Sequence, residues 1–438
     1  MTAAPSVSSG PFTGLTVVEF GQFVVVPFCA QLMADAGARV IKVEPPTGDS
    51  YRTSHQIAPM EGRQFLIKNR GKESIAVDLG HPDAEDVVHA LLRAADVVLV
   101  NLSPAAVLRR GLDYESVRAL NPSVVYGAAT GFGQVGPEAS LPGMDVVVQA
   151  RSGAMSSLAA ERDGLPFHSE VQVADYSAAV MLFGAVAAAL YHRERTGVGQ
   201  RVDVSLLGAA LAVQNNSLAH VHDLDHWRHE FVTDHLPRLR KEGADGARIE
   251  AVRRELRPDP PSHSAHYRVF RTADGAVALG AGSPHSRRRL VELTGVDGTL
   301  ADSDPDAFGD QLAGVLADRS TEEWVRLLRA ADVPVSAVRH IDELFFDEHV
   351  EAEGMVADYD HPVVGRYRGL GVPFRMSATP LDGRGRPSPS FAAGTDAILA
   401  ELGFDAPARE ALVGAGAVLR AIPATTATPA PHADRRTP

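Results

Sequence analysis

Short runs rich in β-branched residues alternate with amphipathic segments through the first half of the chain, and this alternation constrains the fold more than any other feature. Two parallel strands need a crossover connection, usually a helix, so strand–helix–strand units of this length predict a doubly wound α/β domain. Ligand sites are then expected beyond the carboxyl ends of the strands. The predicted strands cover residues 15–20, 40–44, 74–78, 97–100 and 123–126, and the predicted helices cover residues 28–37, 81–95 and 104–109.

The composition changes in the second half of the chain. Residues 220–261 are dense in His, Asp, Arg and Glu, residues 258–261 are rich in proline, and a hairpin pattern follows at 267–279. We therefore expect a smaller α+β domain after the large one. The predicted organisation is a disordered N-terminus (1–13), a large domain (14–219 and 340–422), a small domain with linkers (220–339) and a disordered tail (423–438).

Charge and cysteine content narrow the class of protein. The formal net charge is −13, which argues against a nucleic-acid partner, although an acidic chain can still hold a local pocket for an anion. Basic residues near the predicted strand ends, among them Lys42, Lys72 and Arg109, would suit phosphate groups. Cys29 is the only cysteine, which suits a reducing cytoplasm. The apolar run at 178–191 is too short to span a bilayer, and the N-terminus has no signal-peptide pattern, so we expect a cytoplasmic protein without a membrane partner.

One carboxylate stands where the periodicity changes to that of a helix. Asp175 precedes an almost unbroken apolar run, which predicts a largely buried helix with Asp175 near its N-terminus. The simplest interpretation is that Asp175 caps the helix. A carboxylate at the head of a buried helix is held rigidly and near the interior of the protein, and backbone amides beside it could stabilise an oxyanion.

Three other patterns give weaker predictions. His222 and His226 have a spacing that could bind zinc, but an exposed charged helix explains them equally and no second ligand set stands out, so no metal is expected. Gly131, Gly133 and Gly136 match a dinucleotide-binding fingerprint, yet no apolar helix and no acidic partner follow them. Neither a nucleophile elbow nor a P-loop is present.

Several segments together resemble the family III CoA-transferases, the group that contains formyl-CoA transferase and carnitine CoA-transferase. The resemblance covers roughly residues 14–403. It is carried by Gly-Leu-Thr-Val-Val-Glu-Phe at 14–20, Ala-Asp-Ala-Gly-Ala-Arg-Val-Ile-Lys-Val-Glu at 34–44, Asn-Arg-Gly-Lys-Glu-Ser-Ile-Ala-Val-Asp at 69–78, Ala-Asp-Val-Val-Leu-Val-Asn at 95–101 and Thr-Gly-Val-Gly-Gln at 196–200.

The resemblance implies a Rossmann-like large domain, a small domain and an interlocked homodimer. It also implies an enzyme that moves coenzyme A from an acyl-CoA to a carboxylic acid, with Asp175 as the nucleophile and with aspartyl anhydride and aspartyl-CoA thioester intermediates. The residues that would bind CoA are Arg39, Lys42, Asn69, Arg70, Lys72, Asn101, Leu102 and Arg109, and those that would line the substrate pocket are Val24, Val25, Met144 and Asp145.

The sequence departs from the family's pattern at three places. Val-Val-Val-Pro at 24–27 replaces the frequent Gln-Ala-Gly-Pro, which suggests a bulkier and more apolar acyl pocket. Ser-His-Ser at 262–264 stands near the expected glycine-rich loop, and Ala-Ala-Gly at 392–394 replaces Gly-Glu-His. These changes keep a non-catalytic CoA-binding protein open as an alternative.

The nearest related activity is that of the α-methylacyl-CoA racemases. In that branch a histidine in a Gly-His-Asp segment serves as the second acid or base. This chain has Met144 at that position, and methionine cannot transfer a proton, so a transferase is favoured over a racemase.

Overall fold

The computed structural model describes residues 10–158, 160–257, 265–381 and 386–421. The chain divides into two compact units: unit 1 comprises Met1–Ala219 and Glu351–Pro438, and unit 2 comprises His220–Val350. The second division lies at Val350, beyond the boundary of 339 that we predicted. The expected proline-rich boundary at 258–261, the Ser-His-Ser segment at 262–264 and the tail at 423–438 all lie outside the described residues.

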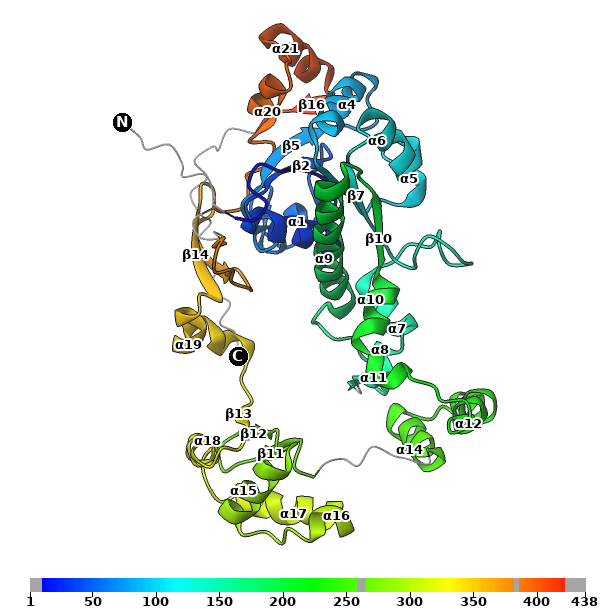
Figure 1. The fold of residues 1–438 in the computed structure, drawn as a ribbon, viewed down its shortest axis with the longest axis vertical. Helices are drawn as coiled ribbons and strands as arrows, with labels where there is room; N and C mark the ends of the chain where they lie inside the picture. Colours follow the sequence, from blue (N-terminus) through cyan, green and yellow to red (C-terminus); the bar gives the residue numbers. More distant parts are fainter. Residues whose placement is uncertain (1–9, 159, 258–264, 382–385, 422–438) are drawn as a thin grey trace, which may run out of the picture. The chain divides into compact units, whose positions relative to one another are not determined.

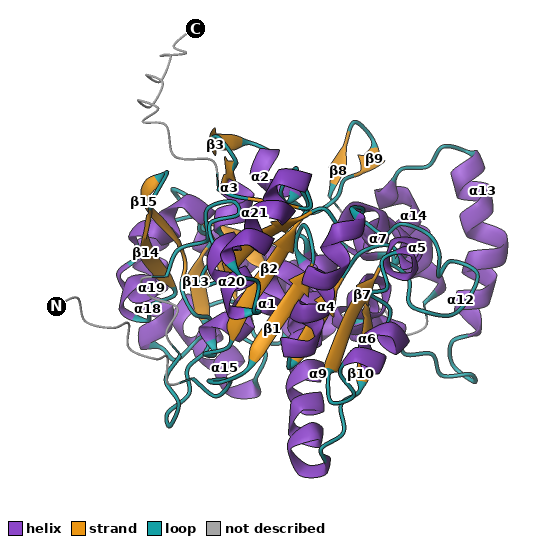
Figure 2. Cartoon of the chain, turned by 90° about the horizontal axis from the view of Figure 1, so that it is seen from above, coloured by secondary structure: helices purple, strands orange, loops and turns teal. Residues whose placement is uncertain are grey.

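Unit 1 is built on one seven-stranded sheet (Figure 1). Its strands lie in the order β10 (Arg201–Ser205), β7 (Val125–Thr130), β6 (Val97–Val100), β1 (Thr16–Phe20), β2 (Arg39–Glu44), β5 (Glu73–Val77) and β16 (Val418–Leu419). All neighbouring pairs are parallel except β16 with β5. The predicted α/β class is confirmed, and the direction of winding reverses between β1 and β6, where ligands of doubly wound sheets bind. Figure 2 shows β2, β1 and β7 of this sheet, in which β6 lies between β1 and β7.

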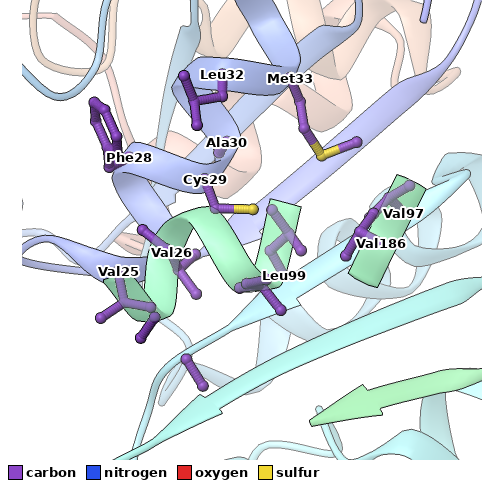
Figure 3. Close-up of a cluster of buried hydrophobic side chains, with 14 of the residues drawn as sticks. Val25, Val26, Phe28, Cys29, Ala30, Leu32, Met33, Val97, Leu99 and Val186 are labelled. Atoms are coloured by element: carbon purple, nitrogen blue, oxygen red, sulfur yellow. The ribbon is translucent and has the colours of Figure 1, made fainter. Parts of the chain in front are cut away.

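Helices cover both faces of this sheet because the strand residues alternate between two apolar clusters. Val17 and Leu99 belong to one cluster, whereas Val18 and Val98 belong to the other. The first cluster, part of which is drawn in Figure 3, includes side chains of α1 (Val25–Asp35), α9 (Val173–Thr196) and α10 (Leu206–Val213). The second includes side chains of α4 (Glu85–Ala94), α6 (Tyr114–Leu120), α20 (Thr395–Glu401) and α21 (Ala406–Ala415).

Short helical segments and three hairpins complete unit 1. The short helical segments are α2 (Ser50–Thr53), α3 (Arg63–Leu66), η1 (Pro82–Ala84), α5 (Pro104–Arg109), α7 (Asp145–Arg151), α8 (Ala154–Ser157) and α11 (Asn215–Leu218). The hairpins are β3 (Gln56–Ala58) with β4 (Glu61–Gly62), β8 (Glu161–Arg162) with β9 (Leu165–Pro166), and β14 (Val356–His361) with β15 (Gly365–Leu370).

Unit 2 has its own small core. A three-stranded antiparallel sheet of β11 (Val269–Arg271), β12 (Ala276–Leu279) and β13 (Val335–Ala337) packs against α15 (Pro284–Thr294), α17 (Pro305–Leu316) and α18 (Thr321–Ala330). The other elements are α12 (His226–Glu230), η2 (Phe231–His235), α13 (Leu236–Lys241), α14 (Gly246–Leu256), α16 (Leu300–Ser303) and η3 (Ile341–Phe346), while α19 (Glu348–Ala352) crosses the division between the units.

Two local predictions are wrong. Residues 10–13 are not disordered: the Phe12 amide donates to the Ala36 carbonyl at 2.8 Å, and the Phe12 ring lies 5.9 Å from that of Phe183. The helix expected to run from 408 to 422 ends at Ala415, because Gly416 adopts a left-handed conformation with φ of 80°. The residues that follow form β16, which pairs with β5.

Helix α9 is longer than the apolar run in the sequence suggested. It has 24 residues, an 18-residue stretch of it has a mean hydropathy of 1.8, and within the described residues it is the one helix whose length and composition would let it cross a membrane. Of its apolar window, 44% is buried inside the protein. Ala178, Leu182, Val186 and Leu190 recur at helical spacing and pack in the first cluster, which explains much of its apolar character.

Candidate active site

Asp175 is the third residue of α9, and its side chain is buried, with the residue 8% exposed. The helix returns the chain to β10, which is parallel to β7, so the N-terminus of α9 lies at the edge of the sheet where the strands end. The interpretation of Asp175 as the helix cap is wrong. That role belongs to Asp145, whose Oδ1 atom accepts from the amides of Ala174 at 2.9 Å and Asp175 at 3.1 Å.

The loop before α7 places Asp145 in this position. The backbones of Gly131 and Gly143 touch there, and a Cβ atom on Gly131 would lie 2.5 Å from the Gly143 Cα atom. This contact accounts for the first glycine of the apparent dinucleotide fingerprint, because it brings the start of α7 against the end of β7. Asp145 is held further by Gln149, whose Nε2 atom donates to Oδ2 at 2.5 Å.

The backbone amides at the head of α9 already have acceptors. Besides the two amides bound to Asp145, the Val173 amide donates to the Val171 carbonyl and the Tyr176 amide to the Gln172 carbonyl. Our expectation that amides at this helix end would stabilise an oxyanion is therefore not supported by their hydrogen bonding. Electrostatic stabilisation would have to come from a side chain.

Two effects weaken the acidity of Asp175. Burial raises the pKa of its carboxyl group, the charge of Asp145 raises it further, and the pKa reaches about 7 although the Lys68 ammonium acts in the opposite direction. At neutral pH the carboxylate is therefore present, poorly solvated and basic. These are the properties of an activated nucleophile.

Lys68 and two tyrosines, Tyr51 and Tyr176, interact electrostatically with this carboxylate, and sequence analysis missed all three. Lys68 is 1% exposed, and its Nζ atom lies 4.9 Å from the centre of the Tyr51 ring and 5.9 Å from that of the Tyr176 ring. Gln64 accepts a hydrogen bond from this ammonium. The available signal was a lysine that directly follows the apolar residues 65–67, since a charge at the end of a buried run needs a reason.

The loop after β1 lies at the switch point of the sheet. Asn101, which follows β6, accepts from the Gln22 amide at 3.0 Å and donates to the Gln22 carbonyl at 2.8 Å. Phe23 has a φ of 66°, an uncommon conformation for a residue with a side chain, and its ring meets that of Tyr51 edge-on at 5.5 Å. Asn101 thus holds in place a strained loop whose Phe23 ring contacts the Tyr51 ring.

Two of the lysines predicted to bind CoA form an internal charge network. Lys42 and Lys72 have fully buried side chains, and they bind opposite oxygens of Glu19 at 2.8 and 2.7 Å. Lys42 also pairs with Asp49 at 2.9 Å. Burial lowers the pKa of Lys72 to about 8, against the effect of Glu19. Lys42 also donates to the Gly21 carbonyl at 2.7 Å and Lys72 to the Pro27 carbonyl at 2.8 Å, so the two lysines support the segment at 21–27 from inside the protein.

The other predicted CoA-binding residues differ in their exposure. Arg70 is buried in a two-pronged pair with Asp35, and Asn69 accepts a hydrogen bond from Lys72 at 2.7 Å. Arg39 is partly exposed and pairs with Glu73 and Glu401. Leu102 is half-buried, and Arg109 is exposed at the last turn of α5. Of the eight residues, Arg109 is the freely exposed cation.

The predicted substrate-pocket residues are likewise divided. Val24 is fully buried, and Val25 packs in the first apolar cluster (Figure 3). Met144 is 49% exposed, directly before the buried Asp145. The structure thus brings Asp145 to Asp175 and leaves Met144 at the surface beside them.

The histidine-rich segment contains His222 and His226, whose spacing could bind zinc. Among the described residues, no group of three or more His, Cys, Asp and Glu side chains is arranged to hold a metal ion. His220 and His222 meet ring to ring at 5.2 Å, and His235 lies 3.3 Å from Glu230.

The structure thus places a buried carboxylate of raised pKa at the end of a parallel sheet. The sequence profile of CoA-transferase family III matches residues 12–395, and the chain belongs to this family. It is therefore an enzyme of the CoA-transferase class that acts on CoA thioesters.

Individual relatives agree along most of the chain. The chain is 34% identical to a succinate–glutarate CoA-transferase of Agrobacterium fabrum, over 90% of this chain and 96% of that protein. It is 30% identical to an acetyl-CoA:oxalate CoA-transferase of Acetobacter aceti, over 77% and 83%. Its structure is similar to that of Rv3272 from Mycobacterium tuberculosis, with a TM-score of 0.71, 26% identity, and coverage of 89% of this chain and 99% of that one.

Proposed function

We propose that this enzyme moves coenzyme A from an acyl-CoA to a carboxylic acid through covalent intermediates on Asp175. The observation that carries the proposal is the state of this carboxylate: it is buried, held on a rigid helix and raised in pKa to about 7. Each step exchanges one activated acyl group for another, so the route needs neither ATP nor a metal ion.

The steps balance without an external proton. An Asp175 oxygen attacks the thioester carbonyl carbon, the carbon–sulfur bond breaks, and CoA thiolate leaves an aspartyl anhydride. The thiolate then attacks the Asp175 carbonyl carbon, which releases the donor acid as a carboxylate and leaves an aspartyl-CoA thioester. The acceptor carboxylate attacks that thioester, which releases CoA thiolate and leaves a second aspartyl anhydride. The thiolate then attacks the acceptor's carbonyl carbon in this anhydride, which forms the product acyl-CoA and restores the Asp175 carboxylate.

The relatives suggest which substrates to test first. A relative that is 34% identical is a succinate–glutarate CoA-transferase, so we propose short dicarboxylic acids as donor and acceptor acids. The apolar segment at 24–27 packs in the interior, and we propose that it shapes the acyl pocket from behind and favours acyl groups larger than formyl or oxalyl. A kinetic series over acyl-chain length that showed a preference for formyl-CoA or oxalyl-CoA would contradict this.

We propose that some of the predicted CoA-binding residues contact CoA and that the others hold the surrounding loops in place. Arg109 is exposed at the last turn of α5, so it can meet phosphates, whereas Arg39 begins β2 at the amino end of the strands and is paired with Glu73 and Glu401. Lys42, Arg70 and Lys72 have buried carboxylate partners, and we propose that with Asn69 and Asn101 they hold the loops in place. Arg109→Ala is expected to raise the KM for succinyl-CoA while the melting temperature stays unchanged.

The interlocked homodimer and the cytoplasmic location remain predictions. An apolar stripe on α9, formed by Val180, Met181 and Tyr191, is 54%, 37% and 65% exposed within one chain, and a partner chain that covered it would remove this apolar surface from water. Light scattering after gel filtration measures the mass in solution, and a monomer would contradict the dimer.

The decisive experiment is Asp175→Asn, with Asp223→Asn at an exposed position as the control. Asparagine keeps the size of the side chain but cannot accept and return the acyl group, so exchange from succinyl-CoA to glutarate should fall more than roughly a thousandfold. The control should keep the parent rate. Wild-type enzyme incubated with succinyl-CoA alone should form the aspartyl-CoA thioester. Borohydride reduces this thioester to an alcohol and releases CoA, so mass spectrometry should find the reduced side chain on the peptide that contains Asp175.

Two outcomes would favour the alternatives. Exchange of the α-proton of a 2-methylacyl-CoA with deuterium from solvent, without any acceptor acid, would indicate a racemase. Binding of succinyl-CoA with neither adduct nor exchange would indicate a non-catalytic CoA-binding protein.

A further inference from the structure

Three lysines are buried in unit 1, and one of them differs from the others in its partners. Lys42 and Lys72 each contact a carboxylate at less than 3 Å. Lys68 is as deeply buried, at 1% exposure, but within the described residues no carboxylate oxygen pairs with its ammonium. Burying a charge without a fixed counter-charge is costly, so this arrangement calls for an explanation.

The surroundings of Lys68 stabilise a cation without neutralising it. The Tyr51 and Tyr176 rings lie 4.9 and 5.9 Å from its Nζ atom, and the Gln64 side chain accepts a hydrogen bond. The nearest influences of opposite sign are the carboxylates of Asp175 and Asp49. Lys68 therefore lies within the field of the nucleophile yet keeps donor capacity free of any fixed ion pair.

The proposed reaction needs a cation that can face a different anion at each step. One negative charge moves through the cycle, from Asp175 to the CoA sulfur, then to the donor carboxylate, and back by way of the acceptor carboxylate. Whenever Asp175 is acylated it is neutral, and Lys68 loses the charge that faced it. The amides at the head of α9 cannot compensate, since their hydrogens are already bonded.

We propose that Lys68 binds the reacting carboxylate of the acceptor acid while Asp175 is acylated, so that one ammonium faces in turn each anion that the reaction forms. This inference rests on the proposed function and adds to it the residue that recruits the acceptor. It also explains why Lys68 lacks a permanent partner, because a fixed carboxylate would compete with the incoming acid.

The charged and titratable groups around the pair act in both directions. Asp49 after β2 favours the ammonium form of Lys68, and burial opposes it, which lowers the pKa of Lys68 to about 8. Tyr51 from α2 and Tyr176 from α9 are neutral, since burial raises the pKa of both hydroxyls. Asp145 from α7 faces Asp175 and raises its pKa. Near neutral pH, Lys68 is thus the cation that faces Asp175.

The test begins from the preformed aspartyl-CoA thioester, where the ionisation of Asp175 plays no part. Wild-type enzyme is loaded with succinyl-CoA near pH 7, freed of small molecules and mixed with increasing butyrate or glutarate, and the rate of acyl-CoA formation is recorded. In Lys68→Met the acceptor concentration for half-maximal rate should rise roughly 10- to 100-fold for both acids, because a charge-assisted hydrogen bond is lost. Lys68→Arg should restore most of the affinity, and the exposed Lys241→Met should behave as wild type.

The outcomes separate this inference from the function beneath it. If wild-type enzyme forms no thioester, the proposed function itself fails. If it does, and Lys68→Met uses both acceptors as well as wild type, the role of Lys68 is refuted. A loss confined to glutarate also refutes it, since Lys68 would then bind the distant carboxylate.

A second readout applies if the methionine variant does not fold. In wild type the acceptor step should weaken as the pH rises above about 8, where Lys68 loses its proton. In Lys68→Arg it should remain constant over that range, because a guanidinium stays charged. An identical decline in both proteins would overturn the proposal.

Discussion

Replacing Asp145 by asparagine separates two effects of one carboxylate on the nucleophile. Asp145 Oδ1 accepts from the amides of Ala174 and Asp175 at 2.9 and 3.1 Å, and its charge adds to burial in raising the pKa of Asp175. Asparagine keeps an oxygen that can accept both hydrogen bonds but carries no charge. The helix cap should therefore remain while the electrostatic effect disappears.

The expected size follows from the geometry. Asp145 binds the amide of Asp175 directly, so the two carboxylates lie within a side-chain length of each other. Two unit charges about 6 Å apart interact by roughly 3 kcal/mol at an effective dielectric constant of 20, which corresponds to about two pKa units. Solvent at the mouth of the site screens part of this, so we expect the pKa of Asp175 to fall by about one to two units.

The assay is the pH dependence of kcat/KM for succinyl-CoA, which reports ionisations of the free enzyme. Asp175 reacts as a carboxylate, so kcat/KM should rise with pH through its pKa and then level off. The midpoint should lie near 7 in wild type and about one to two units lower in Asp145→Asn, with similar plateaus. An unchanged or higher midpoint would refute the assigned effect of Asp145.

Asp145→Ala is the matched control for the helix cap. It removes the charge and the two hydrogen bonds together, so it should show the same midpoint and an additional loss of about 1 kcal/mol in the free energy of unfolding. Gln149 donates a hydrogen bond to the other oxygen of Asp145. In Asp145→Asn an NH2 group replaces that oxygen and cannot accept the bond, so this variant should itself lose about 1 kcal/mol in the free energy of unfolding.

Two further predictions concern stability. Glu19→Gln removes the buried carboxylate that Lys42 and Lys72 share, and it should lower the free energy of unfolding, measured in urea, by about 3–5 kcal/mol. The control Glu115→Gln breaks an exposed ion pair and should cost less than about 1 kcal/mol. Equally small losses in both variants would contradict the buried charge network. Because folding raises the pKa of Asp175 from 3.8 to about 7, its ionised form destabilises the native state above pH 7 and not below about pH 4. Asp175→Asn should therefore stabilise the protein by about 2–4 kcal/mol at pH 8 and by nearly nothing at pH 3.5, as measured by thermal unfolding; a less stable variant at pH 8 would count against the raised pKa.

The pattern of apolar residues determined the sheet of unit 1. The strand predicted at 97–100 and the helix predicted at 104–109 match the structure residue for residue, because buried strands and a proline at a helix start leave clear local signals. The β16 strand could not be read in this way. It is two residues long, and it exists because β5 offers an open edge.

The same distinction runs through the site. The sequence by itself marked Asp175, since a carboxylate at the start of a long apolar helix is visible along one segment of chain. It could not show that Asp145 would cap that helix from thirty positions away, nor that Lys68 would lie between two aromatic rings from α2 and α9. It also could not distinguish Lys72, which is paired with Glu19, from the exposed Arg109. In the sequence both are basic residues at the boundary of a predicted strand or helix, and nothing there shows which one is buried. Burial and pairing between distant segments set the charge state of each group, and these arise only when the chain has folded.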